Sequence, residues 1–374
     1  MNLVFRPADE KLNLTLTLIA VGLISAELFF GLRGTLRPNY SFINLLAGLL
    51  FLEAFHVILT FVGILFTPEL QRWSAALTGG RPWKFWLPVA ARVIFLFSII
   101  FFSSMVTERS TKHSTLLVHL IVVTIVIVTV HHRIFQNQGI SLSYSLILGQ
   151  DSRLRRLEKR AFWLFFSCTA VHYMTYLCRP ALHSLFGFSS HLIQVGRTIS
   201  MALALLFASL LMALAFYQYR QAPEKPAAQY KVVYLFRTFF YPLVSVSYCA
   251  LIATETLHGF EYVLLWRKLS RGFKEKLSSQ KLIISLACAL TIAALFYVVT
   301  YQKFIWKLVG VEGNSAAKTL WLRLSFSTYL AVTLTHFYID KVLFRMKNPA
   351  SRAIIGPMII APATGVATNA GAGD

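Results

Sequence analysis

Acidic residues are scarce in this 374-residue chain, which has 15 Asp and Glu against 36 Lys and Arg. Charged residues of both signs make up only 14% of the sequence, whereas 56% is hydrophobic, and the mean hydropathy is +0.62. A typical soluble domain carries about 25% charged residues. The composition therefore excludes an ordinary soluble domain and indicates a helical membrane protein.

Several motifs of known chemistry are also absent. The chain has no P-loop, no GxGxxG, no HExxH and no HxxxH or HxxHH of the membrane desaturases and hydroxylases. The four cysteines form no CxxC pair, so we expect them to be packing residues and not disulfides or zinc ligands. The net charge of +21 is expected to face anionic lipid headgroups from the loops, with no role in binding nucleic acid.

Long apolar runs alternate with short polar links. Runs such as NLTLTLIAVGLISAELFFGL supply about 20 residues, enough for a helix to cross roughly 30 Å of hydrocarbon. We predict an all-α polytopic transmembrane bundle of about eight to ten spans over residues 1–352, and a disordered low-complexity tail over 353–374. The candidate spans are 13–32, 42–67, 84–105, 114–138, 160–179, 197–218, 238–266, 281–303 and 319–345.

Two strongly basic links constrain the topology, one following the fourth candidate span and one following the seventh. Lys and Arg favour the cytoplasmic side, so both links face the cytoplasm only if residues 160–266 cross the membrane an even number of times. The stretch PALHSLFGFSSHLIQVG is a candidate for the short or re-entrant element that makes the number even. Both termini are then expected to be cytoplasmic.

Histidines and acids recur together inside the candidate spans. Only five acidic residues lie there, and four of them are three or four positions from a histidine. Side chains at that spacing share one helix face. The groups are Glu53 with His56, Glu255 and Glu261 on either side of His258, and His336 with Asp340; His132 has Gln136 four residues later.

This pattern is typical of a metal site built from facing helices. Neutral imidazole binds the ion, and a carboxylate or amide one turn away either ligates it or orients the ring. Several histidines with one or two carboxylates and no thiolate favour iron or manganese, with zinc as an alternative. The predicted ligands are His56, His132, His258, His336 and Asp340, with His131 competing with His132.

The remaining polar partners are expected to act beside the metal. We predict that Glu53, Gln136, Glu255 and Glu261 hold the imidazole rings or transfer protons. His56 and His132 form one pair, and His258 and His336 form the other. The two pairs reach the same depth in the membrane only if an even number of crossings separates them. An odd number would place them in opposite leaflets, an arrangement that suits two stacked b-type haems.

Three short segments, HHRIFQNQG, LHGFEY and THFYIDKVLFR, resemble patterns of a group of bacterial polytopic membrane proteins. These patterns are H-x3-Q-x2-G, H-x2-Q/E-Y and H-x3-D-x3-aromatic-basic. The last segment also looks like the final His–Asp helix of the Brp/Blh-like membrane β-carotene dioxygenases, which implies His-bound iron and cleavage of a carotenoid. No PHG or early His-rich pair of the dioxygenase type occurs here, so the resemblance implies a metal centre without naming a substrate.

The leading hypothesis is an integral-membrane oxidoreductase, a non-haem iron oxygenase of the bacterial inner membrane that acts on a lipid-soluble substrate. Two alternatives remain open at this point. One is a b-type haem electron-transfer subunit, and the other is a transporter or a non-catalytic membrane component in which His–acid pairs carry protons or link helices. Partner subunits are not indicated by the sequence.

Overall fold

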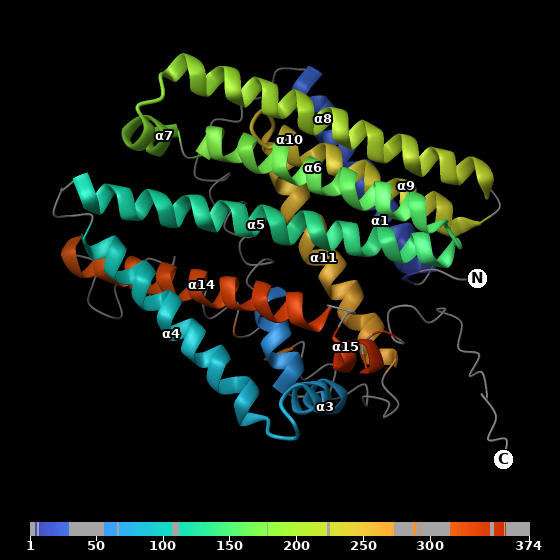
Figure 1. The fold of residues 1–374 in the computed structure, drawn as a ribbon, viewed down its shortest axis with the longest axis horizontal. Helices are drawn as coiled ribbons and strands as arrows, with labels where there is room; N and C mark the ends of the chain where they lie inside the picture. The colour runs from blue at the N-terminus through green and yellow to red at the C-terminus, as the bar shows by residue number, and fades with distance from the viewer. Residues whose placement is uncertain are drawn as a thin grey trace.

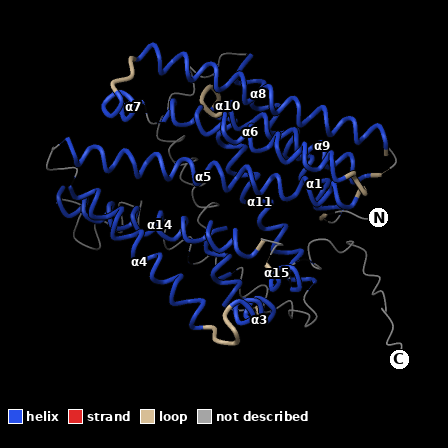
Figure 2. Tube along the Cα trace, viewed as in Figure 1, coloured by secondary structure: helices blue, strands red, loops and turns tan. Residues whose placement is uncertain are grey.

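The computed structural model describes residues 4–5, 7–29, 56–65, 67–106, 112–177, 179–222, 225–272, 287–288, 292, 315–344, 348–354 and 356. Every regular element in these ranges is a helix, as the all-α prediction requires (Figure 1) (Figure 2). The predicted span 281–303 lies almost wholly outside the described residues, as do Glu53 and the tail beyond residue 356.

Local sequence signals account for several helix boundaries. Pro68 and Pro226 stand in the first turns of α3 and α9, where the missing N–H costs no hydrogen bond. Ser189 caps α8 by accepting a hydrogen bond from the Leu192 amide at 3.1 Å. Gly149, with φ of 70°, joins α5 to α6.

The helices are α1 (Pro7–Phe29), a short helix His56–Leu65, α3 (Pro68–Leu77), α4 (Trp83–Val106), α5 (Lys112–Ile147), α6 (Ser152–Leu177), α7 (Arg179–Phe186), α8 (Ser190–Gln221), α9 (Pro226–Phe236), η3 (Arg237–Phe239), α10 (Phe240–Leu243), α11 (Tyr248–Gly272), α14 (Ser315–Leu343) and α15 (Pro349–Ile354).

Helix α5 runs through the middle of the described bundle (Figure 1). Helices α6 and α8 pack together on one side of it, and α14 and α4 pack together on the other. Helices α1 and α11 also pack against one another. Since α5 has 36 residues, it is about 54 Å long and extends well beyond the thickness of a hydrocarbon core.

Two apolar clusters identify the two ends of this bundle. The cluster at what we call the N-terminal end joins residues 4–5 to the end of α5, the start of α9 and the end of α11. The cluster at the opposite end joins the second half of α1 to α10 and the start of α11. The start of α6 also belongs to the N-terminal end, because Glu158 contacts Lys231 there.

The chain makes an even number of passes between the two basic links. It leaves the N-terminal end in α6, returns in α8, leaves again through α9, η3 and α10, and returns in α11 (Figure 1). The start of α6 and the end of α11, where the second basic link begins, therefore lie at the same end of the bundle as residues 4–5, which is the arrangement that the charge pattern favours.

The expectation of one continuous span over 238–266 is wrong. The chain turns at residues 244–247, and α11 begins at Tyr248. Pro242 lacks an N–H, and Glu27 accepts hydrogen bonds from the Ser247 hydroxyl at 2.5 Å and the Cys249 amide at 2.8 Å, so the new helix start is stabilised by a carboxylate. The additional pass is α9–α10, which begins in the expected link RQAPEKPAAQYK, whereas PALHSLFGFSSHLIQVG forms α7 and the start of α8.

Three of the described helices are long and apolar enough to cross a membrane: α1, residues 83–105 of α4, and α8. Large apolar side chains point outward from them, including Phe29, Phe95 and Leu206. These helices fit an integral membrane protein.

A buried ion pair fastens the N-terminal end. Lys231 on α9 is only 1% exposed, and its ammonium donates to Glu158 Oε2 at 2.6 Å, to Ser145 Oγ at 2.5 Å and to Gln218 Oε1 at 2.6 Å. A lysine has three N–H donors, so all three find acceptors on different helices. The interaction thereby ties α9 to α5, α6 and α8.

We expect Lys231→Met to destabilise the protein by about 3–5 kcal/mol, because it leaves the Glu158 carboxylate buried without its cation. Thermal unfolding in detergent, followed by tryptophan fluorescence, measures the effect. The double variant Lys231→Met/Glu158→Gln should recover part of the loss, and exposed Lys11→Met is the control. A double variant no more stable than the single one would contradict this account.

Candidate metal centre

Four separate helices bring histidines to one buried place. His56 begins the short helix His56–Leu65, His132 lies in α5, His258 in α11 and His336 in α14. His56 and His336 are fully buried, and His258 is 3% exposed. The predicted convergence of these side chains is therefore found in the structure, and His132, not His131, faces the cluster. The His131 ring instead stacks on Phe135 at a centroid distance of 4.3 Å.

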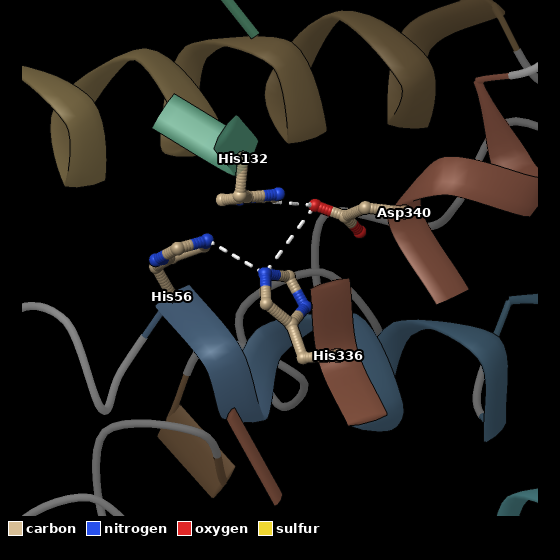
Figure 3. A group of neighbouring side chains, drawn as sticks. All are labelled: His56, His132, His336 and Asp340. Carbon is tan, nitrogen blue, oxygen red and sulfur yellow. Dashed lines mark hydrogen bonds and ion pairs between the residues drawn. The ribbon is translucent and has the colours of Figure 1, made fainter. Parts of the chain in front are cut away.

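Ligand atoms of His56, His132, His336 and Asp340 all lie within 4.8 Å of one another (Figure 3). The Nε2 atoms of His56 and His336 are 2.8 Å apart, and His336 Nε2 is 3.3 Å from Asp340 Oδ2. His132 Nε2 is 3.9 Å from the same carboxylate oxygen. Two ligands bound at about 2.1 Å to one ion are about 3.0–3.4 Å apart in octahedral or tetrahedral geometry, so the group has the dimensions of a metal site.

His258 lies beside this group of four. Its ring packs edge-on against His56 and His132, with centroid distances of 4.8 Å and 5.2 Å. Among the described residues, no hydrogen-bond partner contacts its buried Nε2. Buried ring nitrogens normally have partners, and Nε2 of His132 in the ligand group likewise has no hydrogen-bond partner in the described part of the chain. A bound ion would satisfy nitrogens that point inward.

The Asp340 carboxylate is oriented by a tyrosine for which the sequence predicts no role. Tyr262 donates its hydroxyl to Asp340 Oδ1 at 3.1 Å, and Thr60 hydrogen-bonds to the same phenol oxygen. Oδ1 is thus engaged, and Oδ2 is left facing His336 and His132. Within the described ranges Asp340 makes ion-pair contacts with histidines only, and none with Lys or Arg.

Two of the four predicted accessory residues, Gln136 and Glu261, form a second layer and do not reach the ligand group. Gln136 donates from Nε2 to the His258 carbonyl at 3.5 Å and to Glu261 Oε2 at 3.4 Å. Glu261 accepts from Arg237 through its other oxygen. Arg237, 3% exposed, also donates to Thr17 Oγ1 at 2.7 Å, so this layer links α11 to α1.

Glu255 is placed differently from the prediction. It forms a two-pronged ion pair with Arg133, one N–O distance being 2.6 Å, and belongs to no ligand group of the described residues. His258, three positions later on α11, faces the cluster instead. Glu53, which was predicted to act beside the metal, lies outside the described residues.

An apolar cavity of about 730 Å³ reaches the candidate centre between α5 and α14. A stripe of α5 residues from Ile127 to Leu146 lines it, a length of about 28 Å at 1.5 Å per residue. Leu334, Phe337 and Tyr338 line it from α14, and His132 and Asp340 are in its wall. One side of the ligand group is therefore accessible to an elongated apolar molecule.

No protein-family description, curated protein or solved structure matches the chain. The candidate centre therefore has to be interpreted from its own geometry.

We expect the protein, purified in detergent, to contain a stoichiometric amount of iron or manganese that His336→Ala removes. The reason is that His336 Nε2 lies within 3.3 Å of both its neighbours in the ligand group. Elemental analysis by mass spectrometry measures the content, and exposed His191→Ala is the matched control. Equal metal in the two variants, or none in wild type after loading with either ion, would rule out the site.

Tyr262→Phe is expected to weaken metal affinity by about 10–100-fold while leaving the fold intact, because the Asp340 carboxylate loses the hydrogen bond that fixes its orientation. Competition with a chromophoric chelator gives the affinity. Thermal unfolding of the metal-free protein serves as the control, and an unchanged affinity would show that the phenol does not position the ligand.

Proposed function

We propose that this protein is an integral-membrane oxidoreductase with a mononuclear non-haem centre that acts on a lipid-soluble substrate. The observation that carries the proposal is the buried group of His56, His132, His336 and Asp340 on the wall of an apolar cavity. Ligand pockets for small molecules are mostly apolar with a few convergent polar groups, and this one has that composition.

The donor set favours iron or manganese. Imidazole and carboxylate donors without thiolate are typical of these ions, and four protein ligands leave positions open on a six-coordinate ion. The chemistry that such an ion supplies is activation of dioxygen for oxidation of a bound substrate. The resemblance of the His336–Asp340 helix to carotenoid dioxygenases makes a polyene one candidate substrate.

The protein's own residues would perform the remaining tasks. Tyr262 and Thr60 hold the carboxylate, the Gln136–Glu261 layer supports the α11 backbone beside His258, and the apolar cavity wall excludes water from the reacting centre. Because the N-terminal end of the bundle adjoins both basic links, we also place that end and both termini on the cytoplasmic side of a bacterial inner membrane.

The haem alternative is less favoured by the ring packing. Two axial ligands of one haem iron lie about 4 Å apart across the macrocycle, whereas His56 and His336 approach to 2.8 Å and two more imidazoles fill the adjacent space. The transporter alternative draws support from the buried Arg237–Glu261 pair and the half-buried Arg133–Glu255 pair, since ionisable groups inside membranes often carry protons. Proton flux in vesicles that survives removal of metal would favour transport over oxidation.

An electron paramagnetic resonance experiment tests the class of centre. We expect anaerobic protein loaded with Fe(II) to give a high-spin iron–nitrosyl signal on addition of nitric oxide, because the open positions accept a diatomic ligand. His336→Ala should abolish the signal, and His191→Ala should retain it. A Soret band in the purified protein, or an iron-loaded protein that does not respond to nitric oxide, would be contrary to the proposal.

A further inference from the structure

Lys341 supplies a positive charge to a wall that is otherwise mostly apolar. It stands in the last turn of α14, is exposed, and lines the cavity one position after Asp340. It forms no ion pair with any residue that the structure describes. The opposing face of α5 carries no acid in the cavity lining, where its polar members are His131, His132, Gln136 and Ser143.

A second cation adjoins the same wall. The Arg92 guanidinium carbon lies 3.6 Å from the ring centroid of Tyr338, and Tyr338 lines the cavity one turn before Lys341. Arg92 belongs to the apolar part of α4 that is long enough to cross a membrane. Like Lys341, it has no ion-pair partner among the described residues. An arginine in such a segment is costly, and an anion beside it would lower that cost.

We propose that the cavity binds a single-chain amphiphile with a terminal carboxylate, its head group held by Lys341 and Arg92 and its tail along the α5 stripe. The proposal rests on the proposed function in taking this cavity as the substrate site. Charge complementarity selects the head group, because Lys341 lines the cavity and Arg92 lies against Tyr338 of its wall, and neither cation has an ion-pair partner among the described residues. Asp340 is the only acid among the described lining residues, and Tyr262 already donates a hydrogen bond to it. The apolar stripe along α5, about 28 Å long, suits an extended acyl chain.

Photolabelling tests this assignment without any need for turnover. The ligand is a long-chain fatty acid that carries a diazirine near the end of its tail, added to detergent-purified protein below saturation. We expect labelled peptides from residues 127–146 and 334–344, and suppression of labelling by palmitate but not by methyl palmitate. The variant Arg92→Met/Lys341→Met should be labelled at least about tenfold less, because it lacks both charged donors to the carboxylate.

Matched variants make the result interpretable. Lys341→Arg keeps the charge and should keep most of the labelling, and Lys11→Met removes an exposed lysine elsewhere and should keep all of it. Equal suppression by the ester, labels outside the two segments, or an unaffected double variant would overturn the proposal. Stronger competition by a monoalkyl phosphate than by palmitate would equally overturn the carboxylate assignment.

The metal and head-group sites can be tested separately by labelling His56→Ala, since His56 does not line the cavity. Unchanged labelling there supports the head-group site whatever the metal content of the protein. Loss of labelling in His56→Ala would show that the carboxylate binds at the histidine cluster, and would overturn its placement at Lys341 and Arg92.

Discussion

A polar group buried in an apolar bundle must find a partner, and this constraint organises the interior of the protein. Three buried or half-buried acids each face a basic residue from another helix, in the pairs Glu158–Lys231, Glu255–Arg133 and Glu261–Arg237. Each pair is neutral, which limits the cost of removing both charges from water. Asp340 differs, since imidazoles and a phenol surround it and neutral imidazoles bring no charge. A divalent cation would complete that balance, which is why the histidine cluster and the carboxylate are best understood together.

Helical spacing predicted much of this centre, but it could not predict which partner each side chain of a helix would contact. His336 and Asp340, four positions apart, share a face and both reach the cluster. Glu255 and His258 are three positions apart and differ by about 60° around the α11 axis. That difference is enough for Glu255 to meet Arg133, 122 residues away along the chain, while His258 faces the cluster. Such a choice is determined by the tertiary contacts between α5 and α11 side chains, and the local sequence does not encode it.

The turn at residues 244–247 was missed for a related reason. Hydropathy registers an apolar run, and it does not register a reversal of the chain inside that run. The buried polar groups of the turn are satisfied from distant elements, with Glu27 of α1 accepting from Ser247 and with Ser245 bonded to His172 of α6 at 2.9 Å. Tyr262 stands in the quoted segment LHGFEY, yet its role depends on Thr60 and Asp340 from two other helices. The charge of the basic links, by contrast, bears on the whole topology, and it favours an even number of passes between them.

The position of the cavity also determines how a substrate would reach the centre. At the N-terminal end, Val4 and Leu265 line the cavity and belong to the apolar cluster that packs there, so the part of the lining that they form is apolar. Leu146 and Tyr338 also line the cavity and remain 46% and 37% exposed, so one side of the cavity faces outward from α5 and α14. That side faces the acyl chains if α5 and α14 lie in a membrane. A lipid-soluble molecule would then pass from the bilayer between α5 and α14 without crossing water, and His132 and Asp340 are the ligand-group residues that it meets in the cavity wall.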